Sequence, residues 1–175
     1  MQLMILTTLV QSDRMMGVLF FVGVISGLRV SDMLALTVGQ MQQVMEVTEQ
    51  KTGKIKPISF TDSQWEFIST YMEDMRPHHR LFPTTRQTVH KYFSRVAKDL
   101  GIGNIGTHSM RKTYAYNVFR STKSIKITQK SLNHTYVGTT MGYLVSALFW
   151  AMKRVHKGEI SREIQPSYQG DDENV

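Results

Sequence analysis

The chain has 175 residues, 41% of them hydrophobic and 20% charged, which fits one folded domain and excludes a largely disordered protein. Lysine and arginine outnumber aspartate and glutamate by 21 to 14, and the net charge of +7 favours a polyanionic partner, either nucleic acid or anionic lipid. Charge alone fits a basic protein without such a ligand equally well. Because the chain has no cysteine, disulfides, thiolate metal sites and cysteine nucleophiles are excluded.

A buried helix is the first predicted element, over residues 12–26, with Ser12 as its N-cap and Gly27 at its end. Its apolar run at residues 18–25 is too short to span a bilayer and lacks a signal-peptide cleavage site. We therefore expect no membrane association and a cytoplasmic location. Residues 2–10, upstream of this helix, look like the end of a connecting segment.

A β-hairpin follows in the next part of the chain. Ser31 first caps a short helix at residues 32–36. Residues 43–49 and 55–60 then have the composition of strands, and the turn at residues 51–54 joins them.

The rest of the chain is predicted to be helical. Helices are expected from residue 61 to 75 or 76, from 84 or 85 to 100, from 108 to 119, from 124 to 132 and from 139 to 156. The polar tail at residues 161–175 is expected to be flexible. The sequence thus predicts an α+β class, a mainly helical domain over residues 1–160 with one small antiparallel sheet.

Four residues between positions 106 and 143 suggest chemistry on a phosphodiester. His108 and Arg111 are three apart, so a helix places them on one face, where the guanidinium can bind two phosphate oxygens. His134 and Tyr143 follow, and a tyrosine is a possible nucleophile. Each residue alone has an ordinary structural explanation, such as a paired arginine, a capping or buried histidine, or a core tyrosine.

Four separated motifs carry a family resemblance. They read SGLRVSDMLALT at residues 26–37, EQKTGK at 49–54, HSMRKTYA at 108–115 and LNHTYVGTTMGY at 132–143. In their order and spacing they resemble the tyrosine recombinases, also called phage-type integrases. The resemblance covers roughly residues 12–150 and implies that family's catalytic-domain fold.

The resemblance assigns roles to six residues. The expected catalytic set is Arg29, Lys51, His108, Arg111, His134 and Tyr143, with Tyr143 as the nucleophile. Lys54 competes with Lys51 for the role of the hairpin lysine, because the register of the hairpin is open. One departure is Asn133, where glycine commonly precedes the second histidine.

The implied reaction is a metal-independent DNA cleavage and rejoining through a 3′-phosphotyrosine intermediate, with no cofactor. Tyrosine is a weak nucleophile near neutral pH, so it needs a proton acceptor and charge stabilisation at phosphorus. Two arginines can supply that stabilisation, and a lysine on a flexible hairpin can protonate the leaving 5′-oxygen. The sequence predicts a site-specific DNA recombinase of a phage or mobile element, acting in a bacterial host.

Double-stranded DNA is the expected substrate, and other recombinase protomers are the expected partners, in a tetramer on DNA. Candidate DNA contacts are Arg86, Lys91, Arg95, Lys98 and Lys112. The apolar C-terminal segment that is expected to pack on a neighbouring protomer, or else in its own core, contains Leu144, Val145, Leu148, Phe149 and Trp150.

Two other functions share these features: a DNA-binding regulator that keeps the fold, and a type IB topoisomerase. A complete catalytic set argues against a pure binder. Because no second DNA-clamping domain fits upstream of the first motif, we expect either an isolated catalytic domain, which is favoured, or a short recombinase. The sequence leaves open the target site, the direction of recombination and accessory factors.

Overall fold

The computed structural model describes residues 2–102 and 105–156, and the side chains of residues 7–102 and 105–147. The helices are α1 (Gln2–Ser12), α2 (Arg14–Ser26), α3 (Val30–Ala35), α4 (Asp62–Met72), α5 (Arg86–Asp99), α6 (Thr107–Thr122), α7 (Ile125–Ser131) and α8 (Val137–His156), with a 3-10 turn, η1 (Val38–Gln40). Strands β1 (Val44–Thr48) and β2 (Ile55–Ser59) form an antiparallel pair. The predicted mainly helical domain with a small sheet is confirmed.

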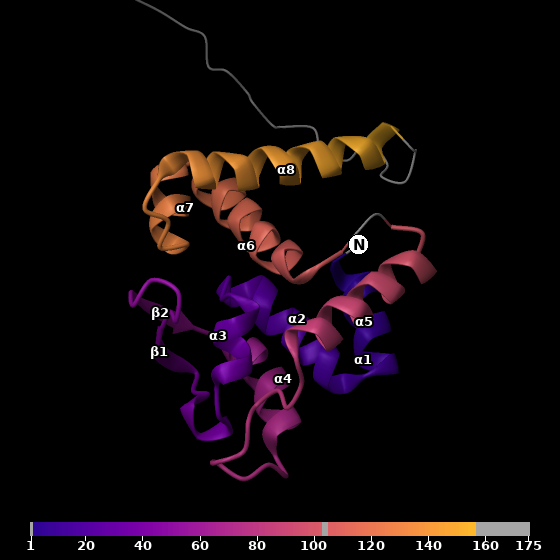
Figure 1. The fold of residues 1–175 in the computed structure, drawn as a ribbon, viewed down its shortest axis with the longest axis vertical. Coiled ribbons are helices and arrows are strands. Elements are labelled where there is room, and N and C mark those ends of the chain that lie inside the picture. Colours follow the sequence, from indigo (N-terminus) through magenta and orange to yellow (C-terminus); the bar gives the residue numbers. More distant parts are fainter. Residues whose placement is uncertain (1, 103–104, 157–175) are drawn as a thin grey trace, which may run out of the picture.

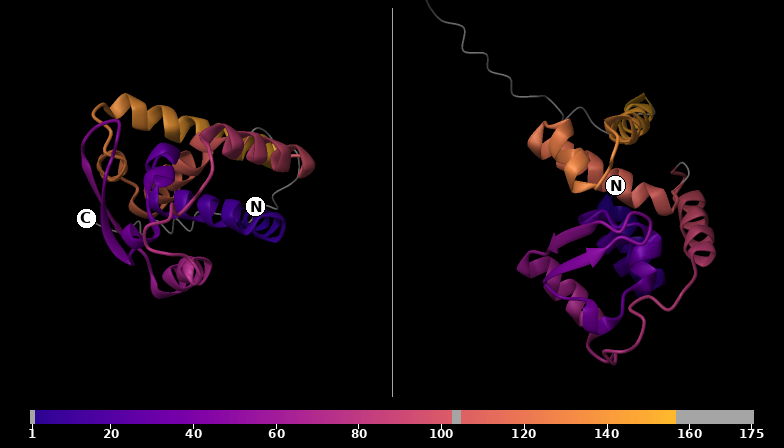
Figure 2. Two further views of the ribbon diagram at one scale, coloured as in Figure 1. Left: turned by 60° about the horizontal axis from the view of Figure 1, so that its bottom comes forward. Right: turned by 60° about the vertical axis from the view of Figure 1, so that its left-hand side comes forward.

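Helix α2 lies at the centre and connects two parts of the fold. In Figure 1, α6, α7 and α8 form the upper part, while α1 to α5 and the hairpin form the lower part. The right panel of Figure 2 shows the same division from another side, and both panels show the hairpin and α5 on different sides of the molecule. Because α2 contacts α1, α4 and α6, it must be apolar on nearly all sides, and its residues from Met16 to Phe20 are all buried.

Two glycines allow α2 to sit this close to α6. A Cβ added at Gly23 would come within 2.5 Å of Met110 Sδ on α6. Gly27 ends α2 with a φ of 65°, a left-handed conformation that glycine adopts without strain, and its Cα faces the Tyr114 ring. The predicted end of this helix is therefore confirmed.

Its predicted beginning is wrong. Asp13, not Ser12, is the N-cap of α2, since its carboxylate accepts from Met16 N at 3.1 Å. Ser12 instead ends α1, the helix formed by the stretch expected to be a connecting segment. The reason is burial, because Leu9 of α1 is only 1% exposed and joins the core.

Two other helix boundaries differ from the prediction. Helix α3 begins at Val30 with Arg29 as its N-cap residue, so Ser31 lies inside the helix. Helix α4 ends at Met72, before residue 75, because Met75 N donates to Met72 O in a tighter turn.

The other helices agree with the sequence to within two residues at their beginnings. Thr61, Thr85 and Ser124 each accept from a backbone N–H in the first turn of α4, α5 and α7. Helix α6 runs three residues beyond the predicted end. The tail at 161–175 lies outside the described residues. Among the residues described, no helix has both the length and the apolar character needed to cross a membrane.

The hairpin has one buried face, and a lysine lies on it. Met45 pairs with Ile58 and Val47 pairs with Lys56, and all four side chains are buried. Alternation along the strands leaves Val44 and Ile55 exposed on the other face. This register decides the position of Lys56, because a shift by one residue would place it in solvent.

Candidate active site

Glu49, directly after β1, lies between two of the predicted arginines. Its Oε1 is 2.7 Å from Arg29 Nη1 and 3.3 Å from Arg111 Nη1. Burial raises the pKa of Glu49, but contacts from Arg29 and Thr52 and the charges of both arginines outweigh this and leave the pKa below its ordinary value. The ionised carboxylate therefore brings together two arginines that are distant in sequence.

Arg111 joins three parts of the chain from inside the fold. Its side chain is 2% exposed; Nη1 also donates to Gly27 O at 2.6 Å, and Nη2 donates to Leu132 O at 2.5 Å. Its Nε is buried and has no hydrogen-bond partner among the described residues. Arg111 thus connects the ends of α2 and α7 to Glu49.

His134 lies in the α7–α8 turn, and its ring contacts the ring of Tyr143 in the second turn of α8. Their ring centroids are 5.0 Å apart and the rings are perpendicular. His134 Nδ1 lies 3.0 Å from Oγ1 of the fully buried Thr140. Burial, followed by the charges of Arg111 and Arg29, lowers the pKa of His134 to about 4, so its ring is neutral at neutral pH.

His108 lies at the surface near the start of α6, among positive charges. Partial burial lowers its pKa, as do the charges of Arg86, Lys112, Arg111 and Lys51, in that order. A polyanion entering here would meet several cations and would favour protonation of this histidine.

Three hairpin lysines have different surroundings. Lys51 is exposed and has no hydrogen-bond or ion-pair partner among the described residues, whereas Lys54 Nζ donates to Asn133 O at 3.4 Å and to Thr135 Oγ1 at 3.3 Å. Lys56 is 3% exposed, donates to Ser131 O, and lies 4.8 Å from the centre of the Tyr114 ring. Burial and then the charge of Arg111 lower the pKa of Lys56 to about 8.

Sequence reasoning assigned no role to three residues that are prominent here. Glu49 stood within a quoted motif, but nothing in the sequence placed it beside Arg29 and Arg111, which are distant along the chain. Thr140 precedes Tyr143 by three positions, which on a helix places both on one face. Lys56 falls on the buried face only once the hairpin register is known.

Comparison with known proteins identifies the family. The sequence profile described as the Phage integrase family matches residues 5–148. The chain belongs to this family. It is 35% identical over 135 residues to the probable integrase/recombinase YoeC of Bacillus subtilis, covering 72% of this chain and 75% of YoeC.

Solved structures of phage-integrase-type recombinases have the same fold. The XerA recombinase superposes with a TM-score of 0.68 at 22% identity, over 89% of this chain and 62% of that chain. A lambda integrase dimer bound to a core site gives 0.65 at 20% identity, over 82% of this chain and 56% of that chain. The chain spans less than half of three further curated relatives, between 43% and 46% of each.

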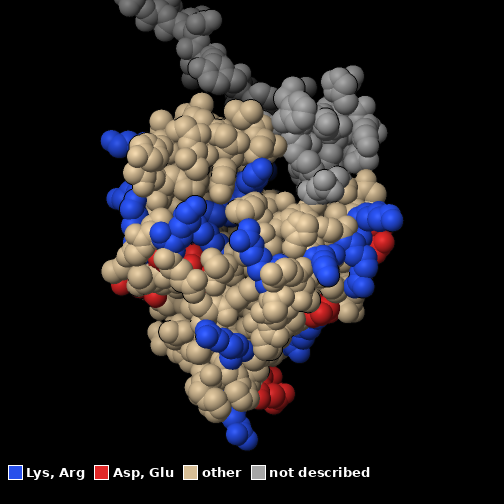
Figure 3. Space-filling model, in the orientation of Figure 1, with Lys and Arg blue, Asp and Glu red and all other residues tan. Residues whose placement is uncertain are grey.

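The predicted DNA contacts divide into two groups. Arg86 and Lys112 lie close enough to His108 to lower its pKa, so they adjoin the candidate site. The others are exposed on α5, opposite its buried stripe: Lys91, Arg95 and Lys98. Figure 3 shows lysine and arginine side chains in a band across the middle of one face, from the hairpin side to the α5 side.

The apolar residues after Tyr143 do not behave alike. Leu144 is 4% exposed and packs with Ala115 and Leu132, so it belongs to the chain's own core. Val145 is 60% exposed. The side chains of Leu148, Phe149 and Trp150 lie outside the described residues.

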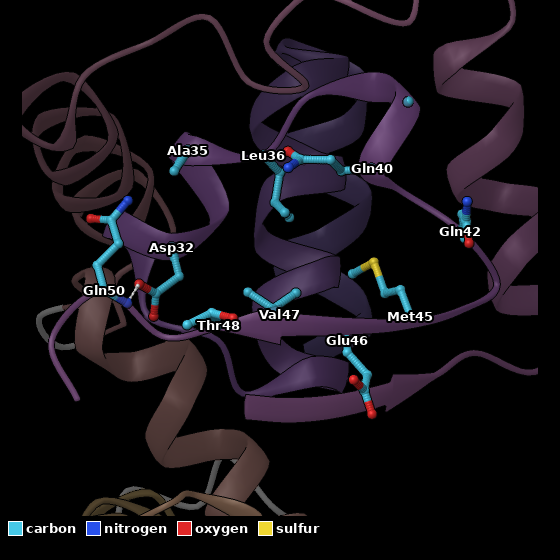
Figure 4. Close-up of a pocket in the computed structure, with 11 residues that line it drawn as sticks. Asp32, Ala35, Leu36, Gln40, Gln42, Met45, Glu46, Val47, Thr48 and Gln50 are labelled. Carbon is cyan, nitrogen blue, oxygen red and sulfur yellow. Dashed lines mark hydrogen bonds between the residues drawn. The ribbon is translucent and has the colours of Figure 1, made fainter. Parts of the chain in front are cut away.

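A pocket of about 510 Å³ lies beside the candidate site, between α3, η1 and β1. Figure 4 shows Asp32 and Gln50 at one side of it, where Gln50 N donates to Asp32 Oδ1 at 3.0 Å. None of the six expected catalytic residues lines it. In residues 2–102 and 105–156, no three His, Cys, Asp or Glu side chains are grouped so as to hold a metal ion.

Proposed function

We propose that this chain is a catalytic domain that cleaves and rejoins double-stranded DNA at specific sites, with Tyr143 as the nucleophile. The observation that carries this proposal is the contact of the Tyr143 ring with the ring of His134. His134 lies in the turn after α7, and Arg111 donates to the carbonyl of Leu132 at the start of that turn. The six expected residues belong to a chain of the phage integrase family, and the structure supports their grouping at one place.

The proposed reaction needs no external energy source. Tyr143 Oη attacks the scissile phosphorus, the P–O5′ bond breaks, and a 3′-phosphotyrosyl bond retains the energy of the broken linkage. Attack of a 5′-hydroxyl on that bond releases Tyr143 and restores a phosphodiester. The proton of Tyr143 passes to a base, and the 5′-oxygen takes up a proton from an acid.

His134 is placed to help deprotonate Tyr143. Its ring is neutral because its pKa is about 4, which makes it available to accept a proton but a weak base. The negative charge of a bound phosphate would raise that pKa, so the basicity of His134 increases once the substrate is in place.

Arg29 and Arg111 stabilise the phosphate charge in this proposal. Arg111 Nε is a buried atom that has no hydrogen-bond partner among the described residues, while Arg29 Nη1 is held by Glu49 Oε1 at 2.7 Å. Buried unsatisfied donors are costly unless a ligand uses them. Preorganised donors of this kind stabilise charge that develops in a transition state.

Lys51, and not Lys54, is assigned as the acid for the leaving group. The ammonium of Lys54 is held by Asn133 O and Thr135 Oγ1, while Lys51 has no such contact and lies at the tip of the same hairpin. A lysine on a hairpin turn can approach a bound DNA strand without disturbing the core.

Assembly of several protomers on DNA is proposed to use α8 and the segment after it. Val137, Met141 and Val145 are spaced by four and are 51%, 42% and 60% exposed, which gives α8 an apolar face without partners among the described residues. The lambda integrase structure is a dimer on a core site. Sedimentation of the complex with DNA measures whether this chain forms a dimer or the expected tetramer.

DNA binding itself is tested by salt dependence. If about five phosphates are neutralised, the log–log slope of affinity against salt is expected to be roughly −4 to −5. A slope near zero would contradict a phosphate-binding role for the exposed cations.

The decisive experiment uses a nicked suicide duplex made from the DNA junction that flanks the gene. The chain should form a covalent adduct with this duplex, and Tyr143→Phe should abolish the adduct while binding is retained. Tyr136→Phe is a matched control, since Tyr136 is 75% exposed and precedes α8 by one residue. Binding without an adduct would indicate a DNA-binding regulator, and relaxation of any supercoiled plasmid would indicate a topoisomerase.

A further inference from the structure

Asn133 occupies a backbone position that normally suits glycine. Its φ of 52° lies in the left-handed region, where asparagine is tolerated better than most residues. Unlike glycine, it has a side chain, and Asn133 Nδ2 donates to Ile55 O at 3.2 Å. The turn that carries His134 is thereby tied to the first residue of β2.

Two lysines of the hairpin reinforce this connection from the other side. Lys54 Nζ reaches Asn133 O and Thr135 Oγ1, and Lys56 Nζ donates to Ser131 O. Bonds from lysine ammonium groups are charge-assisted and are stronger than neutral ones. They also neutralise the negative end of α7.

The two connected segments carry different halves of the candidate chemistry. Lys51 lies in the hairpin turn, three residues before Lys54, while His134 directly follows Asn133. Helix α8 then places Tyr143 against His134. Any change in the separation of hairpin and turn would move Lys51 relative to the nucleophile.

We propose that Asn133 is a positioning residue, whose side-chain amide fastens the hairpin to the α7–α8 turn and so places Lys51 for protonation of the leaving 5′-oxygen. This role rests on the proposed function. Asn133 touches no reacting atom in it and acts through Lys51.

Asn133→Gly tests the side chain alone, because glycine adopts the same positive φ without strain and only the side-chain amide is lost. Loss of one hydrogen bond should increase hydrogen exchange of the β1 and β2 amides roughly twofold to tenfold, without a change in α2. Lys123→Gly is the matched control. Lys123 is the other described non-glycine residue with positive φ, lies in the α6–α7 turn, and makes no hydrogen bond to the hairpin.

Cleavage of two substrates separates positioning from a general loss of structure. On the nicked duplex with a normal 5′-oxygen, Asn133→Gly should slow adduct formation roughly twofold to tenfold. On the same duplex with a 5′-bridging sulfur, which leaves without a proton, its rate should equal that of the wild type. Equal slowing on both substrates would overturn the proposal, because the residue would then act on Tyr143 or on the fold.

A double variant gives the sharpest test. In a Lys51→Ala background the additional Asn133→Gly change should have no effect on cleavage of the normal duplex, since the group that it positions is gone. If Asn133→Gly slowed cleavage by the same factor in the Lys51→Ala background as in the wild type, the proposal would be overturned. If the wild type forms no adduct at all, the proposed function fails, and hydrogen exchange alone then decides whether Asn133 holds the hairpin.

Lys54→Met provides a second route if Asn133→Gly folds poorly. It removes the ammonium and keeps the aliphatic chain, so it weakens the same connection from the hairpin side. Lys54→Met should slow cleavage of the normal duplex and leave cleavage of the sulfur duplex unchanged. If it showed no such difference, and hydrogen exchange of the β1 and β2 amides were also unchanged, the proposal would be overturned.

Discussion

Arg29 and Arg111 share one oxygen of Glu49, at 2.7 and 3.3 Å. The ionised, buried carboxylate between them offsets the repulsion of the two like charges, while Gly27 O and Leu132 O also hold Arg111. A phosphate that binds at this place must therefore do so beside an existing ion cluster, in which Asp32 Oδ2 also lies 4.0 Å from Arg29 Nη1 and two carboxylates balance the two arginines.

Glu49→Gln should lower the free energy of unfolding by about 3 kcal/mol, because it removes the carboxylate shared by two adjacent arginines and leaves Arg111 without an ion-pair partner among the described residues. Glu46→Gln is the control, since Glu46 is exposed on β1, the strand that directly precedes Glu49. Urea denaturation of both variants measures the difference. A change for Glu49→Gln no larger than that for Glu46→Gln would mean that the cluster contributes nothing to stability.

The stability difference between the wild type and Glu49→Gln should depend on pH in the acidic range. Because the pKa of Glu49 is lowered on folding, its contribution is fully present above its ordinary value of 4.5 and is lost as pH falls through the lower folded-state value. The stability difference between wild type and Glu49→Gln should thus shrink below pH 4.5. Denaturation curves at several acidic pH values measure this trend, and a constant difference would contradict it.

Arg29→Ala and Arg111→Ala should both slow cleavage, on the order of 10²-fold or more, as loss of a preorganised donor does. Their stabilities should differ. The Arg29 side chain is 20% exposed, whereas Arg111 also binds Gly27 O and Leu132 O from a position 2% exposed. Thermal melting should show the larger loss for Arg111→Ala, and equal losses would contradict the connecting role of Arg111.

Much of this fold was accessible from sequence because its signals are local. Caps such as Thr61, Thr85 and Ser124, and the glycine after α2, act within one helical turn of their own position. Helix α1 was missed because its place depends on the burial of Leu9 against other helices. Local pattern carries no information about such contacts.

The candidate site was predictable only through its motifs. Arg29, Arg111, His134 and Tyr143 were singled out, and all four make contacts within the site. Glu49 and Lys56 were not, because their positions follow from partners far along the chain or from cross-strand register, and Thr140 was not, although its partner His134 is only six residues away. A buried lysine in particular reads as a surface residue until Val47 is known to pair with it.

Lys56→Met should be more stable relative to wild type at pH 7 than at pH 10. Burial lowers the pKa of Lys56 from 10.5 to about 8, so charging it costs on the order of 3 kcal/mol below pH 8. This cost disappears as pH rises from 8 towards 10.5, since the folded and unfolded states then both hold a neutral amine. Chemical denaturation across this range checks the trend, and a pH-independent difference would argue against a depressed pKa.

Thr140→Val should disturb His134 without altering the packing volume. The change removes a hydroxyl 3.0 Å from His134 Nδ1, so cleavage should fall roughly tenfold and stability by about 1 kcal/mol. Thr140→Ser should restore the rate, because serine returns the hydroxyl. Thr139→Val is the neighbouring exposed control, and an equal effect there would remove Thr140 from this role.

Lys51→Ala should show the largest difference between oxygen and sulfur leaving groups. An alkoxide leaves poorly without a proton, so loss of the general acid should slow cleavage of the normal duplex by roughly 10² to 10⁴. The 5′-bridging sulfur substrate should recover most of that rate. Lys54→Ala should lose far less, because Lys54 binds Asn133 O and Thr135 Oγ1 and serves only to hold the hairpin. A larger sulfur rescue for Lys54→Ala than for Lys51→Ala would exchange the two roles. No rescue for either would reject a lysine acid, since the proton would then have to come from a group outside the hairpin.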